Sequence, residues 1–176
     1  MNRGLLIALY LPVCYDGKKQ KGICKMDEIT LIPIGFVRNQ VTTKKDQFWG
    51  EDISVIELKE EFRGGLTGLQ EFSHAIILCH LNKAAYIPEK HLLRRPRNRA
   101  DMPMLGIFSQ RTKDHPNQIA ITSVEIRSVS ETTVTVKGLD ALDGTPVLDI
   151  KPYFPVYDRR EARTPEWVDV LMENYF

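Results

Sequence analysis

The sequence has few cysteines, and their spacing limits the chemistry that they can support. Cys14, Cys24 and Cys79 are the three cysteines among 176 residues, and no two of them form a CxxC pair. An odd number without that spacing argues against both a disulfide framework and a zinc knuckle. It favours a reducing, cytoplasmic setting.

The sequence also lacks an excess of charge of either sign. Lysine and arginine together number 24, aspartate and glutamate 23, and the net charge is +1. No global positive field therefore marks the chain as a binder of nucleic acid, and any such role must depend on a local basic patch.

The common nucleotide-binding loops are missing. No GxGxxG motif follows an expected strand, and Gly64-Gly65 lacks the Lys-Ser or Lys-Thr of a phosphate loop. These absences disfavour a dehydrogenase or a methyltransferase of the Rossmann type.

The apolar run near the start of the sequence is too short to cross a membrane. Residues 5–13 follow Arg3 and resemble a secretory signal, but no small-residue cleavage site comes after them. Met26-Asp27-Glu28 resembles a second start, directly before the first expected strand. We expect residues 1–25 to be a leader or extension, residues 26–176 to form one domain, and no association with a membrane.

From Ile29 onward, short apolar runs separated by turn residues predict strands rather than long helices. The expected strands are residues 31–38, 53–58, 74–81, 104–109, 119–127 and 132–137. Each is rich in residues that favour strands, and polar and apolar residues alternate in 132–137. The pattern predicts a mainly β protein, either a barrel or a sandwich.

One short helix is expected near the end of the sequence. Thr164 offers an N-cap, Pro165 suits the first helical position, and Trp167, Val170 and Leu171 share one face. We expect this helix to dock on the β structure by that face.

Histidines and a cysteine raise the question of a metal site, which their spacing does not favour. His74 and His80 would face the same side of one strand and Cys79 the other side. Six residues of strand span about 20 Å, which is too far for one ion to bridge. We expect no metal.

An arginine-rich stretch has two interpretations. HLLRRPRNR, residues 91–99, places four arginines in six positions. It is either a solvated loop or a loop that contacts phosphates, because guanidinium groups pair with phosphate oxygens. Its position directly before the strongest motif favours the phosphate-contacting loop. The four residues are Arg94, Arg95, Arg97 and Arg99.

The stretch DGTPVLDIKPY, residues 143–153, contains a turn followed by reactive side chains. An Asp-Gly pair between apolar runs is typical of a hairpin turn. The same turn exposes backbone donors and acceptors to a ligand. Asp149, Lys151 and Tyr153 at a strand end are more than a turn requires.

Several strings together resemble the tRNA threonylcarbamoyl-adenosine methyltransferases, the TsaA-like or TrmO family. They are GLDALDGTPVLDIKPYFP (138–155), GIFSQRTKDHPNQIAIT (106–122), IPIGFVRN (32–39), GLQEFSHAIIL (68–78) and PEWV (165–168). The resemblance runs from about residue 29 to the last residue. It implies a single compact β-barrel with short peripheral helices, a homodimer, and S-adenosyl-L-methionine as cofactor.

The resemblance also assigns residues to the cofactor. The matching positions are Gln47, Asn82, Lys83, Arg111, Ile121, Asp143, Gly144, Thr145 and Pro146. Some of these depart from the family pattern: Asn82-Lys83 stand where relatives carry a histidine and its neighbour, and Ile121 stands where they carry Leu or Met. His115 replaces an arginine, which would weaken phosphate contact or change the substrate.

The implied reaction transfers a methyl group to the exocyclic amino nitrogen of threonylcarbamoyl-adenosine beside the anticodon. That nitrogen is a poor nucleophile, so the enzyme must position it and accept its proton. Asp149 and Tyr153 are the candidate acceptors. The arginine set, with Arg111 and Asn117, would hold the anticodon loop of tRNA. Two alternatives stay open: a module that senses the cofactor or binds RNA, and a methyltransferase with a different acceptor.

Overall fold

The computed structural model describes residues 29–176. Residues 32–176 form one compact unit that contains every element named below. The expectations for residues 1–25 and for a second start at Met26 lie outside the described residues. Among the described residues, no helix has the length and apolar character needed to span a bilayer.

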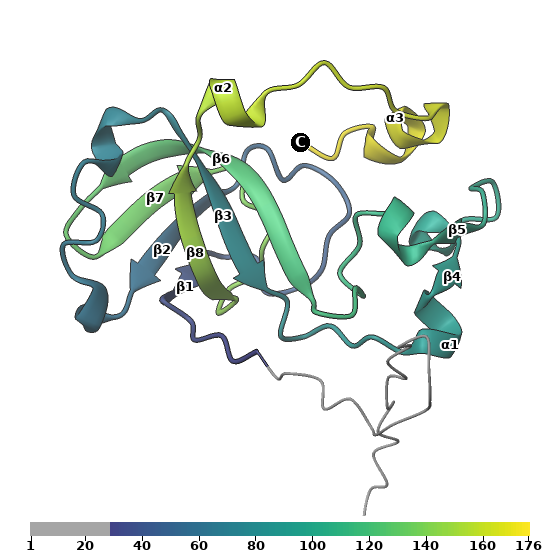
Figure 1. Ribbon diagram of the computed structural model, residues 1–176, viewed down its shortest axis with the longest axis horizontal. Coiled ribbons are helices and arrows are strands. Elements are labelled where there is room, and N and C mark those ends of the chain that lie inside the picture. The colour runs from purple at the N-terminus through teal and green to yellow at the C-terminus, as the bar shows by residue number, and fades with distance from the viewer. Residues whose placement is uncertain (1–28) are drawn as a thin grey trace, which may run out of the picture. The chain divides into compact units, whose positions relative to one another are not determined.

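Six antiparallel strands close into a barrel, which confirms the mainly β prediction (Figure 1). In order around the barrel they are β1 (Gly35–Arg38), β2 (Ile53–Leu58), β7 (Thr133–Lys137), β6 (Ile119–Val129), β3 (His74–His80) and β8 (Pro146–Pro152). Every neighbouring pair is antiparallel. Closure leaves no open sheet edge in the barrel.

Alternation along the strands fills the barrel interior. Val134 and Val136 of β7 are fully buried, as are Ile56 of β2 and Ile77 of β3. Each such side chain contributes about 1.5–3 kcal/mol by leaving water. Gly35 is required where β1 meets β2, because a Cβ at this position would lie 2.3 Å from the Glu57 carbonyl oxygen.

Most of the expected strands form, with shifted ends. The strand expected at 53–58 has those bounds, β6 runs two residues beyond the expectation, and β1 starts later. The strand expected at 104–109 is wrong: its residues form β5 (Leu105–Gly106) and a 3-10 turn, η4 (Ile107–Ser109). β8 was not among the expected strands.

The segment between β3 and β6, residues 81–118, is called the arm here. It contains α1 (Pro88–His91), β4 (Leu93–Arg94), η3 (Pro96–Asn98), β5 and η4. β4 and β5 pair only with each other among the described strands, and Figure 1 shows them beside the barrel. The arm carries the arginine-rich stretch away from the barrel wall.

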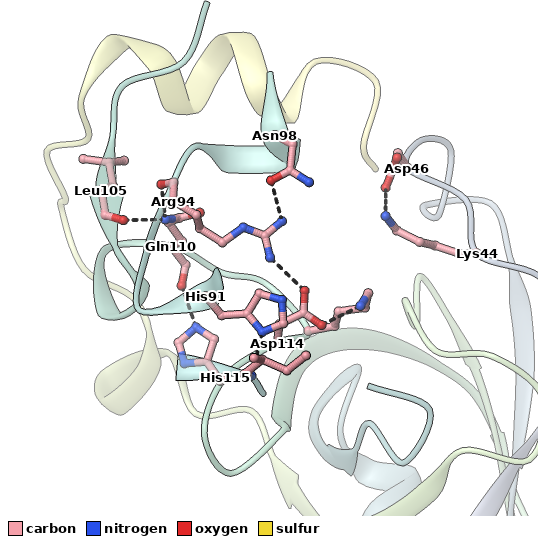
Figure 2. Close-up of polar contacts among 11 residues, drawn as sticks. Lys44, Asp46, His91, Arg94, Asn98, Leu105, Gln110, Asp114 and His115 are labelled. Carbon is pink, nitrogen blue, oxygen red and sulfur yellow. Dashed lines mark hydrogen bonds and ion pairs between the residues drawn. The ribbon is translucent and has the colours of Figure 1, made fainter. Parts of the chain in front are cut away.

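The remaining helical elements are short. They are η1 (Glu60–Phe62), η2 (Leu69–Glu71), α2 (Pro155–Asp158) and α3 (Glu166–Met172). α3 is the expected terminal helix, although Pro165 rather than Thr164 is its N-cap. The prediction that it docks on the barrel is wrong, since Figures 1 and 2 show it beside the arm. Its apolar face is not fully covered, since Val170 is half exposed and no residue of α3 is buried.

Candidate functional site

A carboxylate at one end of the barrel is bound by two hydroxyl groups. Asp140 follows β7, and its Oδ1 accepts a hydrogen bond from the hydroxyl of Thr122 in β6. The Tyr175 hydroxyl donates to Oδ2 across 2.8 Å. Cys79 of β3 lies within the field of this carboxylate: burial, and then the charge of Asp140, raise the pKa of its thiol to about 12. The thiol therefore stays protonated at neutral pH and is no nucleophile.

Tyr175 also contacts the arginine-rich stretch. The Arg97 guanidinium carbon lies 5.6 Å from the centroid of its ring, within the range of a cation–π contact. Burial and the charge of Asp140 raise the pKa of the Tyr175 hydroxyl, against the opposing charges of Arg97 and Arg111. The hydroxyl thus remains a donor to Asp140 throughout the physiological range.

Arg111 and Ile121, two of the expected cofactor residues, are brought together. The Arg111 side chain donates from Nη2 to the backbone carbonyl of Ile121 in β6. Ile121 points outward and is 50% exposed. The remaining Arg111 donors make no hydrogen bond within the described part of the chain, and its charge reaches Tyr175. Arg111 therefore lies close to Tyr175, whereas the exposed Ile121 side chain is on the face of β6 opposite to Thr122, the partner of Asp140.

The backbone amides of the Asp-Gly turn are bonded within the protein. The amides of Asp143, Gly144 and Thr145 donate to carbonyl oxygens of Val41, Val37 and Leu142. The Asp143 carboxylate accepts from the Asn39 amide at 3.1 Å. These three donors are thus already bonded: one reaches Val37 of β1, one reaches Val41 just after it, and one closes the turn itself.

Thr145 and Pro146, the other two residues of this turn, are buried. Gly144 has φ +76°, which favours glycine, and a Cβ there would meet nothing within 4 Å. The glycine is therefore required by the turn and not by a close neighbour. The amides of this turn are thus bonded within the protein, and the assignment of residues 143–146 to the cofactor stays a prediction.

Gln47 lies next to the contact of Arg97 with Asp46, whereas Asn82 and Lys83 lie where the arm leaves β3. Gln47 is exposed, and it follows Asp46, whose carbonyl oxygen accepts from Arg97 at 3.1 Å. Asn82 and Lys83 come after β3, where the Leu81 amide donates to the Gln118 carbonyl. They are exposed at the root of the arm.

The arginine-rich stretch is largely bonded within the arm. Arg94 pairs with Asp114 at 2.8 Å, and their side chains are 12% and 7% exposed. Arg95 donates to the Met102 carbonyl, and Arg99 pairs with Asp101.

A buried polar network surrounds Asp114 (Figure 2). Gln110 donates to the carbonyls of Arg94 and Leu105, and a ring nitrogen of His115 contacts the Gln110 carbonyl at 2.9 Å. Burial raises the pKa of Asp114, but hydrogen bonds from Lys113 and Arg94 outweigh it and hold that pKa below its usual range. The network fixes the shape of the arm. Asn117 stays exposed at the turn before β6.

The two candidate proton acceptors lie at different places, Asp149 in β8 and Tyr153 just past its end. Leu78 pairs with Ile121 on one side and with Asp149 on the other, so the backbones of Asp149 and Ile121 are two strand spacings apart, about 10 Å. Tyr153 lies four residues further along the chain, about 13 Å from Asp149. Its amide donates to the His74 carbonyl, and its side chain lines an open hollow of about 530 Å³. Asp149 pairs with Lys151 at 2.7 Å.

Sequence reasoning missed Asp140, Thr122 and Tyr175. Asp140 stands inside the quoted motif GLDALDG, three residues before Asp143, so the motif did contain a signal. No local signal in the sequence indicates Tyr175, because its contact with Asp140 joins positions 35 residues apart.

Comparisons with known proteins agree on one group. Residues 35–159 match the family described as the tRNA-methyltransferase O N-terminal domain. A probable S-adenosyl-L-methionine-binding protein of Methanothermobacter thermautotrophicus is 37% identical over 137 residues, which are 74% of this chain and 94% of the relative. A tRNA (adenine(37)-N6)-methyltransferase of Mus musculus is 41% identical over 93 residues, covering 53% of this chain and 21% of the relative.

A crystal structure of TrmO from Pseudomonas aeruginosa has a TM-score of 0.67 and 28% identity. The similarity covers 82% of this chain and 63% of that one. The chain thus spans less than two thirds of this solved structure and about a fifth of the mouse enzyme.

Proposed function

The chain belongs to the family of the tRNA-methyltransferase O N-terminal domain, and we propose from this premise that it is an S-adenosyl-L-methionine-dependent tRNA methyltransferase. Its acceptor is the exocyclic amino nitrogen of threonylcarbamoyl-adenosine beside the anticodon. The observation that carries the proposal is the cluster of Arg111, Tyr175 and Asp140 at one end of the barrel, with the Ile121 carbonyl bonded to Arg111. Relatives named for cofactor binding and for tRNA methylation support it.

The side chains of this cluster fit the chemical groups of the cofactor. Arg111 has unused donors for the carboxylate of a methionine moiety. Asp140 offers an acceptor for ribose hydroxyls or an ammonium group, and Ile121 offers apolar surface to an adenine ring. Gln47 adds an amide from the neighbouring loop. When bound, the cofactor supplies a methyl group activated by its sulfonium.

Asp149 is the better candidate for accepting the proton of the amino nitrogen. Only Leu78 of β3 lies between its backbone and that of Ile121, whereas Tyr153 lies just past the end of β8, about 13 Å from Asp149. A carboxylate is also a stronger base at neutral pH than a phenol hydroxyl. Tyr153 instead lines the hollow beside His74.

Two groups of arginines have different parts in binding tRNA. Arg94 and Arg95 are bonded inside the arm and fix its shape. Arg97, Arg99 and Arg111 are the arginines that would reach phosphates, because their hydrogen bonds are exposed, whereas the ion pair of Arg94 and the hydrogen bond of Arg95 are partly buried. Asn117 would contact the same anticodon loop from the turn before β6.

The proposed enzyme acts as a cytoplasmic homodimer. Several large apolar side chains of the arm face solvent in the single chain, with Phe108 80% exposed and Leu92, Leu93 and Met104 more than half exposed. Large apolar side chains that remain exposed in a single chain commonly mark a protein interface where they gather into a patch. A second copy covering it would lie next to Arg111.

A cofactor-binding protein without methyl transfer is the second candidate. The relative that this chain covers almost completely is named only for binding S-adenosyl-L-methionine. The ring nitrogen of His115 contacts the Gln110 carbonyl, so this position does not offer the free cation that an arginine would. The third candidate function is a methyltransferase that acts on another acceptor.

Calorimetric titration with S-adenosyl-L-methionine tests the cofactor half of the proposal. Wild type should bind, and Arg111→Ala should raise Kd by about tenfold or more, because a charge-assisted hydrogen bond contributes about 1.5–3 kcal/mol. Arg127→Ala is the matched control, since Arg127 is an exposed β6 residue paired with Glu125. Absence of binding by wild type would reject the proposal, and an unchanged Kd in Arg111→Ala would place the site elsewhere.

A further inference from the structure

Residues 174–176 lie along the loop that contains Gln47. The Phe48 amide donates to the Asn174 carbonyl at 2.7 Å, and the Trp49 amide donates to the Tyr175 carbonyl at 2.8 Å. These two bonds hold the segment in register with the loop. Figure 1 shows the chain returning from α3 toward the barrel to reach this position.

A glycine permits this close approach. A Cβ on Gly50 would lie 2.7 Å from the backbone carbonyl carbon of Phe176 and 3.1 Å from its Cα. Any larger residue at position 50 would push the segment away. The backbone of Tyr175 is thereby fixed on one side, its ring lies against Arg97, and its hydroxyl reaches Asp140.

We infer that Tyr175 is a positioning residue that holds the Asp140 carboxylate in the orientation that binds the cofactor. The inference rests on the proposed function, because it assigns Tyr175 a part in the same site.

The hydrogen-bond capacity of Asp140 allows this role. An ionised carboxylate has about four acceptor positions on its two oxygens. Thr122 occupies one position on Oδ1 and Tyr175 one on Oδ2, so each oxygen keeps a position for a ligand. With both oxygens held, the carboxylate does not have to be ordered when the ligand binds, and that saving appears as affinity.

A purely structural role for Tyr175 predicts different behaviour. If the side chain only anchored the segment, loss of its hydroxyl would reduce the stability of the fold and leave cofactor binding unchanged. If it orients Asp140, loss of the hydroxyl reduces cofactor affinity, and it does so at temperatures where the variant is fully folded. The affinity for tRNA stays the same in that case, because the ring against Arg97 is retained.

Tyr175→Phe in the full chain separates these roles, because it deletes one oxygen and keeps the ring. We expect Kd and KM for S-adenosyl-L-methionine to rise about tenfold, as for the loss of one hydrogen bond to a charged group. The value of kcat and the KM for tRNA should change less than about twofold, because the variant keeps the ring that contacts Arg97. Tyr157→Phe is the matched control, because Tyr157 is 73% exposed and outside the site.

Each outcome has one meaning. Wild type that binds the cofactor together with Tyr175→Phe that binds it equally well overturns the inference and leaves the proposed function intact. A lowered melting temperature with unchanged Kd overturns it in favour of a structural anchor. Failure of wild type to bind the cofactor overturns both. An equal rise of Kd in Tyr157→Phe overturns the assignment to Asp140.

Discussion

The ion pair between Arg94 and Asp114 should be a main determinant of the stability of the arm. Asp114→Asn keeps the size and the acceptor oxygen of the side chain but removes its charge. The Arg94 guanidinium, 12% exposed, then lies in the protein without a full counter-charge. Removing one partner of a buried pair costs about 3–5 kcal/mol. Lys113, the second partner of Asp114, is partly exposed and can be solvated when the charge is removed. We therefore expect a loss of stability at the lower end of this range, about 3 kcal/mol.

Urea unfolding at pH 7, with thermal melting as a second probe, measures this loss. For a domain of this size, about 3 kcal/mol corresponds to a melting temperature lower by about 6–12 °C. Asp101→Asn is the control, because it breaks the exposed pair with Arg99 by the same chemical change and should leave stability at the wild-type value. A loss below about 1 kcal/mol for Asp114→Asn would refute the view that this pair is desolvated.

The same pair predicts a dependence on pH. The pKa of Asp114 is lower in the folded chain than in the unfolded chain, where it is about 3.9. Its contribution is therefore complete above that unfolded value and is lost as the pH falls through the folded value. The difference in stability between wild type and Asp114→Asn should be constant from pH 6 to 8 and should narrow below about pH 4. A difference that widens on acidification would contradict the assignment.

Three further predictions concern the site. Gly50→Ala should displace Phe176 and weaken cofactor binding while the far-ultraviolet circular dichroism of the barrel stays unchanged; unaltered binding by calorimetry would argue against the close approach. Asp149→Asn should lower kcat about a hundredfold or more and Tyr153→Phe should have little effect in single-turnover assays, and the reverse order would exchange their roles. Arg97→Ala should reduce the slope of log affinity for tRNA against log salt concentration by about 1, and an unchanged slope would remove Arg97 from the phosphate contacts.

The barrel was predictable because its signal is local. Strands such as β2 and β7 alternate buried and half-exposed residues, and this period of two is visible in the sequence. The pattern did not predict β8, because prolines stand at both of its ends and proline usually argues against a strand. At strand ends the missing amide hydrogen is tolerated, so Pro146 and Pro152 are compatible with the ladder.

The site was predictable only in part, because its contacts are long-range. Arg111 and Ile121 are ten residues apart and share a quoted motif, and the structure brings them together. The amides of Asp143 and Gly144 donate to the carbonyl groups of Val41 and Val37, about a hundred residues earlier, which no local pattern indicates. Likewise, composition cannot distinguish an arginine in water from Arg94, whose counter-charge is 20 residues away.

Mass spectrometry of digested tRNA nucleosides tests the central claim most directly. The full chain is incubated with S-adenosyl-L-methionine and with tRNA that carries threonylcarbamoyl-adenosine, and the nucleosides are compared with a reaction that lacks the cofactor. We predict conversion of threonylcarbamoyl-adenosine into a product heavier by one methyl group. Bound cofactor with no change in that nucleoside would contradict the proposed acceptor.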